Sequence, residues 1–473
     1  MADRAILNEL TAVSPIDGRY RKKIEGLAPY MSEYALIKAR VQVEVAYLVA
    51  LSEHPNIPVR EFTPDEMKTF ATLHDLSIES AGLIKQIETK GYLDIKKTNH
   101  DVAAVVAYLR RILKDTSLAD VVEWIHFGLT SEDINNLAYA VILRGAVTQV
   151  LAPALMQIGN VVDEMSNKYA HLPMLSRTHG QPATPTTLGK ELRVFVVRLA
   201  GQLLQLNRFK LTVKLNGASG NYCAHVAGLP KVDWLGFTER LVKTFNRNLG
   251  EDEIRMPFTP NFFTTQIEPH DTYAELFGII MRINVVLVGF CQDLWRYISD
   301  DWLMQTPIEG EVGSSAMPQK VNPIDFENAE GNLLIADALM ELFCRKLPIS
   351  RLQRDLSDST VERSFGTMFG HCLVAYKAIS AGLGKISANP HKIAQALRGH
   401  PEVVAEGIQT ILRREGVSGS YDLLKEMTRG KAVTAEGLRE FIISLKMSSE
   451  VEEELLALTP DKYIGLAAGL ATS

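Results

Sequence analysis

The chain has 473 residues, of which 46% are hydrophobic and 22% charged, so it can bury the large core of an ordinary globular protein. A formal net charge of −6 at pH 7 argues against nucleic acid as a partner, because a nucleic-acid-binding surface needs a basic stripe. We find no apolar run that predicts a membrane span and no signal peptide behind Met1, so we expect a cytoplasmic protein without membrane contact.

If the protein is an enzyme, the sequence predicts that it works without a cofactor or a metal. The four cysteines are widely spaced and form no C-x-x-C pair, which argues against a disulfide framework or a zinc site. There is no phosphate-binding P-loop and no plausible dinucleotide fingerprint. Any chemistry must therefore be carried by the side chains themselves.

The N-terminal part, residues 1–120, is predicted to be a helical domain. Its Asp17-Gly18 pair signals a turn, which leaves Arg19 and Tyr20 side by side before a helix that begins near Ser32.

A polar group stands near the end of this part, ahead of an apolar run with helical period. It consists of Asn99, His100 and Asp101. Asn99 and Asp101 could be helix caps and His100 a surface residue, as most such clusters are. The other interpretation places all three on a substrate.

The central part, residues 121–365, is predicted to contain three very long helices. The apolar period indicates helices from residue 133 past 168 with a kink at Pro153, from 188 to about 214, and from 271 to before Pro307. Three such segments imply an elongated bundle, whose apolar faces often continue into partner subunits. The last part, residues 366–473, is again a helical domain, so the fold class is all-α.

Polar clusters stand at the edges of these long segments. In residues 176–185, a glycine and two prolines exclude a helix and hold His179 in a rigid turn. One cluster is weak evidence, since capping residues gather at helix starts. Several clusters with histidine or arginine are harder to attribute to capping. The other candidates in them are Thr130, Ser131, Gln266, Arg354, Ser359, Thr360 and Arg363.

A loop rich in small polar residues, 313–323, lies between two apolar-periodic segments. It reads Gly-Ser-Ser-Ala-Met-Pro-Gln-Lys-Val-Asn-Pro. Its hydroxyls at Ser314 and Ser315, its backbone N–H groups and the Lys320 charge suit the binding of a carboxylate or the holding of a serine anion. A simple connector between two helices is the alternative on spacing alone.

The pattern Gly-Ser-Ser-x-Met-Pro-x-Lys-x-Asn resembles the signature loop of the fumarase/aspartase superfamily. The resemblance covers nearly the whole chain, at residues 11–20, 98–101, 130–136, 176–185, 264–271, 313–328 and 351–363. It implies an all-α fold of three domains with a central bundle of very long helices. It also implies a homotetramer with active sites shared between subunits.

The branch that the chain is most similar to removes fumarate by β-elimination from succinylated purine nucleotides of purine biosynthesis. By this resemblance Ser314 is the general base and His179 the general acid, with His100 in a supporting role near the phosphate or the reacting groups. Lys320 and Asn322 are expected at the succinyl carboxylates. The phosphate is expected at Arg19, Tyr20, Arg354, Ser359 and Arg363, and further substrate contacts at Asn99, Asp101, Thr130, Ser131, Gln266, Ser315, Asn328 and Thr360.

Other interpretations remain open. Superfamily branches that act on argininosuccinate, aspartate or fumarate have no nucleotide phosphate to bind, so the arginine groups would lack a purpose there. A scaffold that had lost activity would be expected to have drifted at Ser314, His179 or Lys320, and all three are present. His270 and His371 are interpreted as structural, with His270 the more doubtful because it lies in a matching cluster.

Overall fold

The computed structural model describes residues 8–247, 249, 254–307, 317, 319–429 and 433–473. The chain forms two compact units. The first consists of Met1–Leu155, Gln202–Val285 and Gly331–Lys377, and the second of Met156–Gly201, Val286–Glu330 and Ala378–Ser473. The three predicted domains stay a prediction, because several long helices pass from one unit into the other.

The N-terminal helices all belong to the first unit. The side chain of Ser32 accepts a hydrogen bond from the Ala35 N–H at 3.1 Å, so the third helix begins directly after Ser32, as predicted. The helices are α1 (Arg21–Ile24), α2 (Ala28–Met31), α3 (Glu33–Ser52), α4 (Pro64–His74), α5 (Ile78–Thr89) and α6 (Asp101–Leu113), with short 3₁₀ turns at Glu25–Leu27 and Ala119–Trp124.

The first predicted long helix is continuous from Ser131 to Lys168. It runs as α7 (Ser131–Ala146), a π-helical turn (Val147–Leu151) and α8 (Ala152–Lys168). Pro153 follows directly after the π-helical turn. A proline inside a helix cannot donate a backbone hydrogen bond and crowds the carbonyl four residues earlier, and the wider turn accommodates both effects. The irregularity predicted at Pro153 is therefore this turn.

The second long helix, α9 (Leu188–Arg208), ends earlier than the predicted position near residue 214. The chain continues as strand β3 (Leu211–Val213), which pairs in parallel with β4 (Phe258–Pro260). Lys214, which follows, is completely buried and forms an ion pair with Asp133 at 2.9 Å. This buried charge pair requires an extended segment here, which outweighs the helical apolar period.

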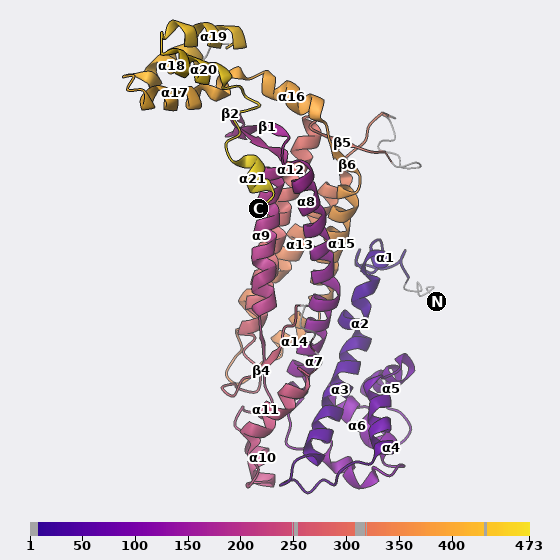
Figure 1. Cartoon of the computed structure of the whole chain (residues 1–473). Helices are drawn as coiled ribbons and strands as arrows, with labels where there is room; N and C mark the ends of the chain where they lie inside the picture. The colour runs from indigo at the N-terminus through magenta and orange to yellow at the C-terminus, as the bar shows by residue number, and fades with distance from the viewer. Residues whose placement is uncertain (1–7, 248, 250–253, 308–316, 318, 430–432) are drawn as a thin grey trace. The chain divides into compact units, whose positions relative to one another are not determined.

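The long helix α12 (Asp271–Ser299) contacts three other long helices that Figure 1 labels: α9, α13 (Ile324–Lys346) and α15 (Phe365–Leu383). In the first unit, the ring of Phe277 on α12 contacts Phe343 on α13 and Phe365 on α15 at centroid distances of 5.8 and 5.2 Å. In the second unit, Phe195 on α9 contacts Phe290 on α12 at 5.1 Å. The mostly helical fold with long helices is confirmed.

The described residues also contain two other two-stranded sheets. None of the strands was predicted. One is a β-hairpin of β1 (Pro173–Thr178) and β2 (Gln181–Thr187), and the other pairs β5 (Leu303–Gln305) with β6 (Ile386–Ala388). Short helices lie between these elements, namely α10 (Cys223–Gly228), α11 (Trp234–Thr244) and α14 (Ser357–Glu362).

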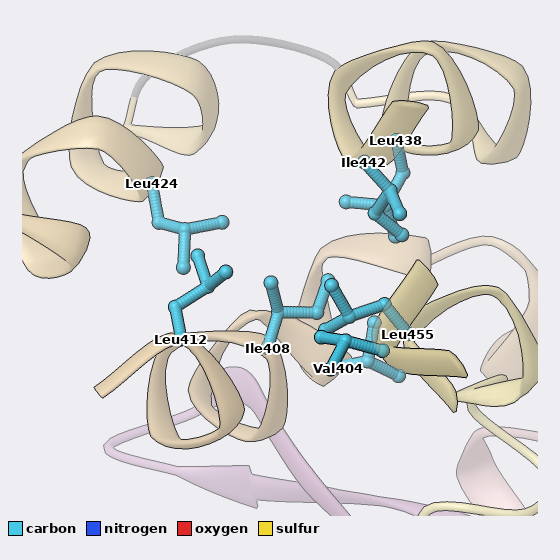
Figure 2. Close-up of a cluster of buried hydrophobic side chains, with 8 residues drawn as sticks. Val404, Ile408, Leu412, Leu424, Leu438, Ile442 and Leu455 are labelled. Carbon is cyan, nitrogen blue, oxygen red and sulfur yellow. The ribbon is translucent and has the colours of Figure 1, made fainter. Parts of the chain in front are cut away.

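The C-terminal helices of the second unit pack around their own apolar cluster. Figure 2 shows Val404, Ile408 and Leu412, spaced four residues apart along one helical face, turned toward Leu424 and Leu455. The helices are α16 (Pro390–Arg398), α17 (Ala405–Arg414), α18 (Ser420–Thr428), α19 (Ala435–Ser444), α20 (Ser449–Ala457) and α21 (Ala467–Ala471).

The expectation that no apolar run reaches the length of a membrane span was wrong. Ser131–Lys168 and Asp271–Ser299 are both long and apolar enough to cross a membrane by length and composition. In α12, 56% of the most apolar window is buried inside the chain. A helix inside a bundle is apolar on several faces, so this composition is weak evidence for a membrane protein.

Candidate active site

In the first unit, His100 stands at the start of α6 and faces Ser131 at the start of α7. The Nδ1 of His100 accepts the N–H of Ala103 at 3.4 Å, so the N-cap of α6 is His100 and not Asn99 or Asp101, the caps that the sequence suggested. Its Nε2 lies 3.4 Å from the Ser131 hydroxyl, and half of the side chain is exposed. The starts of α6 and α7 thus lie close together and place His100 beside Ser131, 31 residues further along the chain.

Asp101 connects this pair to Arg363. Its carboxylate accepts a 2.7 Å hydrogen bond from Arg40, which is only 2% exposed, and lies 3.5 Å from the Arg363 guanidinium. Burial alone would raise the pKa of the Asp101 carboxyl, but Arg40, the Val102 amide and Arg363 lower it below its ordinary value. Asp101 therefore remains an anion at neutral pH.

The two candidate arginines differ in what holds them. Arg363 is 48% exposed, and its ion pairs with Asp101 and Glu33, at 3.5 and 3.6 Å, are long. Its guanidinium can therefore turn to an anionic ligand at little cost. Arg354 is 18% exposed and forms a 2.6 Å ion pair with the buried Glu132, so it is held more firmly within the protein.

A buried ion pair holds the loops behind this cluster. Asp133 accepts the backbone N–H of Thr130 at 2.8 Å and forms the pair with Lys214. Lys214 in turn donates to the Gln266 carbonyl at 2.8 Å, and the Gln266 side chain donates to the Ala218 carbonyl at 3.3 Å. The candidates Thr130 and Gln266, 136 positions apart, are thus positioned by the same pair.

Arg19 and Tyr20 lie on a turn beside a cavity of about 490 Å³ in the first unit. The cavity is lined by the neighbours of these two residues in sequence, Asp17 and Arg21, and by Arg363. Arg19 is exposed and Tyr20 half-buried. Two guanidinium groups, Arg21 and Arg363, and two carboxylates, Asp17 and Glu25, line this cavity. The guanidinium groups can pair bidentately with phosphate oxygens.

The remaining first-unit candidates are less informative. Asn99 is exposed and has a backbone φ of +52°, a left-handed conformation that asparagine tolerates better than most residues. Thr360 is exposed, and Ser359 donates its backbone N–H to Asp358 at 2.6 Å. These observations do not test the substrate contacts predicted for the three residues.

In the second unit, His179 lies at the tip of the β1–β2 hairpin. The register pairs Thr178 with Gln181, so the turn consists of His179 and Gly180 alone. Their φ values of +53° and +77° are of the sign that a tight type I′ hairpin turn requires at both central positions. His179 is exposed. The rigid turn predicted from glycine and proline is therefore found as a hairpin tip that presents an imidazole.

The signature loop is described only at its end. Ser314 and Ser315 lie outside the described residues. Lys320 is exposed and donates its backbone N–H to the Met317 carbonyl at 3.2 Å, while Asn322 and Asn328 are half-buried. Lys320, Asn322 and Asn328 belong to the second unit, together with His179.

Several polar residues of the cluster were not predicted as part of it. Arg40 and Asn135 lie within apolar helices, and Lys214 was expected to belong to a helix. Arg40 donates to Asn135 at 2.9 Å, and Asn135 donates to Glu132 at 2.8 Å. A charged residue on an otherwise apolar helical face was the available signal, because burying such a charge is costly unless it is paired.

The histidines interpreted as structural are buried. His371 is bonded to Asn332 at 2.8 Å, and His270 lies 3.3 Å from the buried Glu362, with 1% of its surface exposed. Arg351 lies 3.7 Å from Asp355, the neighbouring acid. His126, which was not singled out, bonds to the buried Glu44 at 2.6 Å.

Comparison with known proteins gives family matches over most of the chain. A family model described as "Lyase" matches residues 18–336, and a model described as "Adenylosuccinate lyase C-terminal" matches residues 350–464. Solved structures with a similar fold include 3-carboxy-cis,cis-muconate lactonizing enzyme from Pseudomonas putida (TM-score 0.71, 18% identity, covering 94% of this chain and 95% of that chain). Fumarate lyase from Mesorhizobium sp. BNC1 has a TM-score of 0.68 and 16% identity, over 94% and 96% of the two chains.

The long-helix fold and the first family model define a lyase of the fumarase/aspartase class. Adenylosuccinate lyase of Escherichia coli K12 is 45% identical over 464 residues, which is 98% of each chain, and that of Dictyostelium discoideum is 46% identical over 470 residues, 97% of each chain. The chain therefore belongs to the adenylosuccinate lyase family, and it is a carbon–nitrogen lyase.

Proposed function

We propose that the protein removes fumarate from adenylosuccinate, giving AMP, and from the succinylaminoimidazole carboxamide ribotide of purine biosynthesis. Ser314 takes a proton from the carbon beside one succinyl carboxylate, and the electron pair expels the nitrogen from the neighbouring carbon. His179 gives its proton to that nitrogen. An imidazole suits this task, because its ordinary pKa near 6.5 lets it hold and release a proton near neutral pH.

The carbanion that forms on proton removal places extra negative charge on the carboxylate. Lys320, exposed in the described end of the signature loop, and Asn322 beside it are the groups that we assign to the succinyl carboxylates. Cations and amide donors lower the barrier when they are aimed at charge that develops in the transition state.

The observation that carries the nucleotide assignment is the half-exposed Arg363 at the wall of the 490 Å³ cavity. Arg363 is charged, weakly held and next to the turn of Arg19 and Tyr20, as a phosphate site requires. His100 and Ser131, which face one another near Asp101, would contact the same substrate. Arg354 is held by Glu132 at 2.6 Å, which supports an orienting role beside its predicted phosphate contact.

We further propose a homotetramer whose sites are shared between subunits, acting in the cytoplasm. The long helices expose apolar side chains that an isolated soluble chain would leave in water. On α9 these are Val194, Val197 and Leu204, and on α13 Leu334, Ile335 and Leu342, each 40% exposed or more. Apolar side chains at helical spacing on neighbouring elements support association of identical chains.

A substrate panel tests the proposal. We expect purified protein to convert adenylosuccinate to AMP and fumarate in equal amounts, followed by the ultraviolet change, with argininosuccinate and aspartate untouched. Removal of the 5′-phosphate from adenylosuccinate should lower kcat/KM by roughly 10-fold to 10²-fold for each charged hydrogen bond that is lost, since one such bond contributes about 1.5–3 kcal/mol. Turnover of argininosuccinate in place of adenylosuccinate would contradict the assignment.

A further inference from the structure

The hairpin that presents His179 has a poor backbone hydrogen-bond ladder. Strand β2 contains Pro182 and Pro185, and neither can donate a ladder hydrogen bond. The register shifts between Met174 and Ser176 on the opposite strand, so β2 has an extra residue at this position. Such bulges redirect the strand beyond them, here toward the tip. The direction of the tip therefore depends on what holds β2 beside the bulge.

Thr184, at this irregular position, is hydrogen-bonded to helix α17 of the same unit. Its hydroxyl donates to the Oε2 of Glu406 at 2.8 Å, and the hydroxyl of Tyr463 donates to the same oxygen at 3.3 Å. The Thr184 carbonyl also accepts a hydrogen bond from the Ser176 hydroxyl on β1. One carboxylate thus links the bulge to two parts of the C-terminal region.

Glu406 itself stands on a firm base. It lies in the first turn of α17, while Val404, Ile408 and Leu412 hold the opposite side in the apolar cluster of Figure 2. A side chain at Gly407 would come within 2.8 Å of Leu458 and of Tyr463, so the helix is packed closely at this point. The backbone of α17 that carries Glu406 is therefore fixed to the C-terminal core, while the Glu406 carboxylate itself is exposed.

Strand β2 also contacts the 3₁₀ turn Pro401–Val404 and α21, and on the side of α17 it borders an open space. A cavity of about 660 Å³ lies between Pro182–Thr184 and α17 with α18. Its wall includes Ala183, Glu402 and Glu406. Thr184 and Glu406 both line this cavity, and the hydrogen bond between them links β2 to α17 there.

We propose that Glu406 is a positioning residue for the elimination: it fixes β2 at Thr184 and thereby sets the place of the turn that carries His179. The proposal rests on the proposed role of His179 as the acid. His179 lies five residues from Thr184, which is at most about 17 Å of extended chain. A shift at the bulge is thus passed directly to the imidazole, and displacement of a reacting group by about 1 Å can cost about 10²-fold in rate.

The test compares Glu406→Ala, Glu406→Gln and the control Glu402→Ala. Glu402 lines the same cavity and lies one turn earlier, but its carboxylate bonds to His400 at 2.9 Å and not to the hairpin. We expect Glu406→Ala to lower kcat on adenylosuccinate about tenfold with KM changed less than about twofold. Glu406→Gln retains an oxygen that can accept both hydroxyls and should keep kcat within about threefold, and Glu402→Ala should be close to wild type.

A double variant checks the route of the effect. In a Thr184→Val background, Glu406→Ala should cause little further loss, because the bond is already absent. Unchanged kcat in Glu406→Ala, equal losses in Glu402→Ala, or a full further loss in the Thr184→Val background would overturn the proposal. If His179→Ala kept normal activity while Glu406→Ala lowered kcat, the acid assignment would be wrong but the link between hairpin and α17 would stand.

Discussion

Single residues at the candidate site owe their positions to partners far away in sequence. His100 meets Ser131, 31 residues on, and Asp101 meets Arg40, 61 residues earlier. The visible candidates could be predicted, because histidine and arginine beside helix starts form recognisable clusters. Their buried partners Arg40 and Lys214 could not, since a lone charge in an apolar stretch does not indicate which distant carboxylate compensates it.

Replacement of Ser314 by alanine should affect the chemical step and spare binding. Loss of a general base lowers kcat by about 10²–10⁴-fold, while KM for adenylosuccinate should change little because the loss falls on the transition state. Steady-state kinetics with Ser315→Ala as the matched neighbour would measure this, and Ser315→Ala should lose less. Near-normal turnover of Ser314→Ala would mean that another group removes the proton.

Acid should destabilise the protein through His225. This ring is completely buried against Tyr222 and Trp234, and among the described residues neither of its nitrogens has a hydrogen-bond partner. Burial, against the opposing charge of Asp133 and with a smaller contribution from the charge of Lys214, lowers the pKa of His225 to about 4. In the unfolded chain this histidine has its ordinary pKa near 6.5, so as the pH falls the unfolded chain binds the proton before the folded protein does.

Stability from the neutral ring is therefore fully present above pH 6.5 and is lost as the pH falls toward 4. Between pH 7.5 and 5 this loss is about 2 kcal/mol. His225→Phe removes the titrating group, so its Tm should fall less over this interval than the wild-type Tm does. The exposed His391→Phe is the control. The same Tm change with pH in His225→Phe and wild type would contradict this explanation.

Secondary-structure elements were predictable where one pattern dominates. The 3.6-residue apolar period of α12 indicated its start, and Ser32 indicated the start of α3. The end of α9 was not predictable, because a long-range ion pair between Lys214 and Asp133 decides it. The π-helical turn before Pro153 shows the same limit, since the sequence marked an irregularity there without its form.

The β1–β2 hairpin shows how an element can serve function with little intrinsic stability. Its two-residue turn forces positive φ on His179, a non-glycine residue, and its prolines weaken the ladder. Glycine and proline in the sequence correctly excluded a helix. They could not reveal the support from Glu406, which lies 222 residues farther along the chain.

In the whole molecule, the candidate groups belong to two compact units. His100, Ser131, Arg354 and Arg363 lie in the first unit, whereas His179 and the described end of the signature loop lie in the second. Long helices carry the chain between them, and a helix of 29 residues such as α12 extends about 43 Å at 1.5 Å per residue. Antiparallel packing of identical chains can bring groups at distant helix ends together, which is why we propose shared sites.

The central claim is that each elimination site contains His179 of one chain and Ser314 of another. The direct measurement mixes inactive His179→Ala with inactive Ser314→Ala, dissociates and reassembles them, and follows adenylosuccinate turnover. With equal amounts and random assembly, about a quarter of the sites should carry both intact groups and about a quarter of the wild-type activity should return. No recovery, despite hybrid tetramers shown to have formed, would contradict the claim and place both groups in one chain.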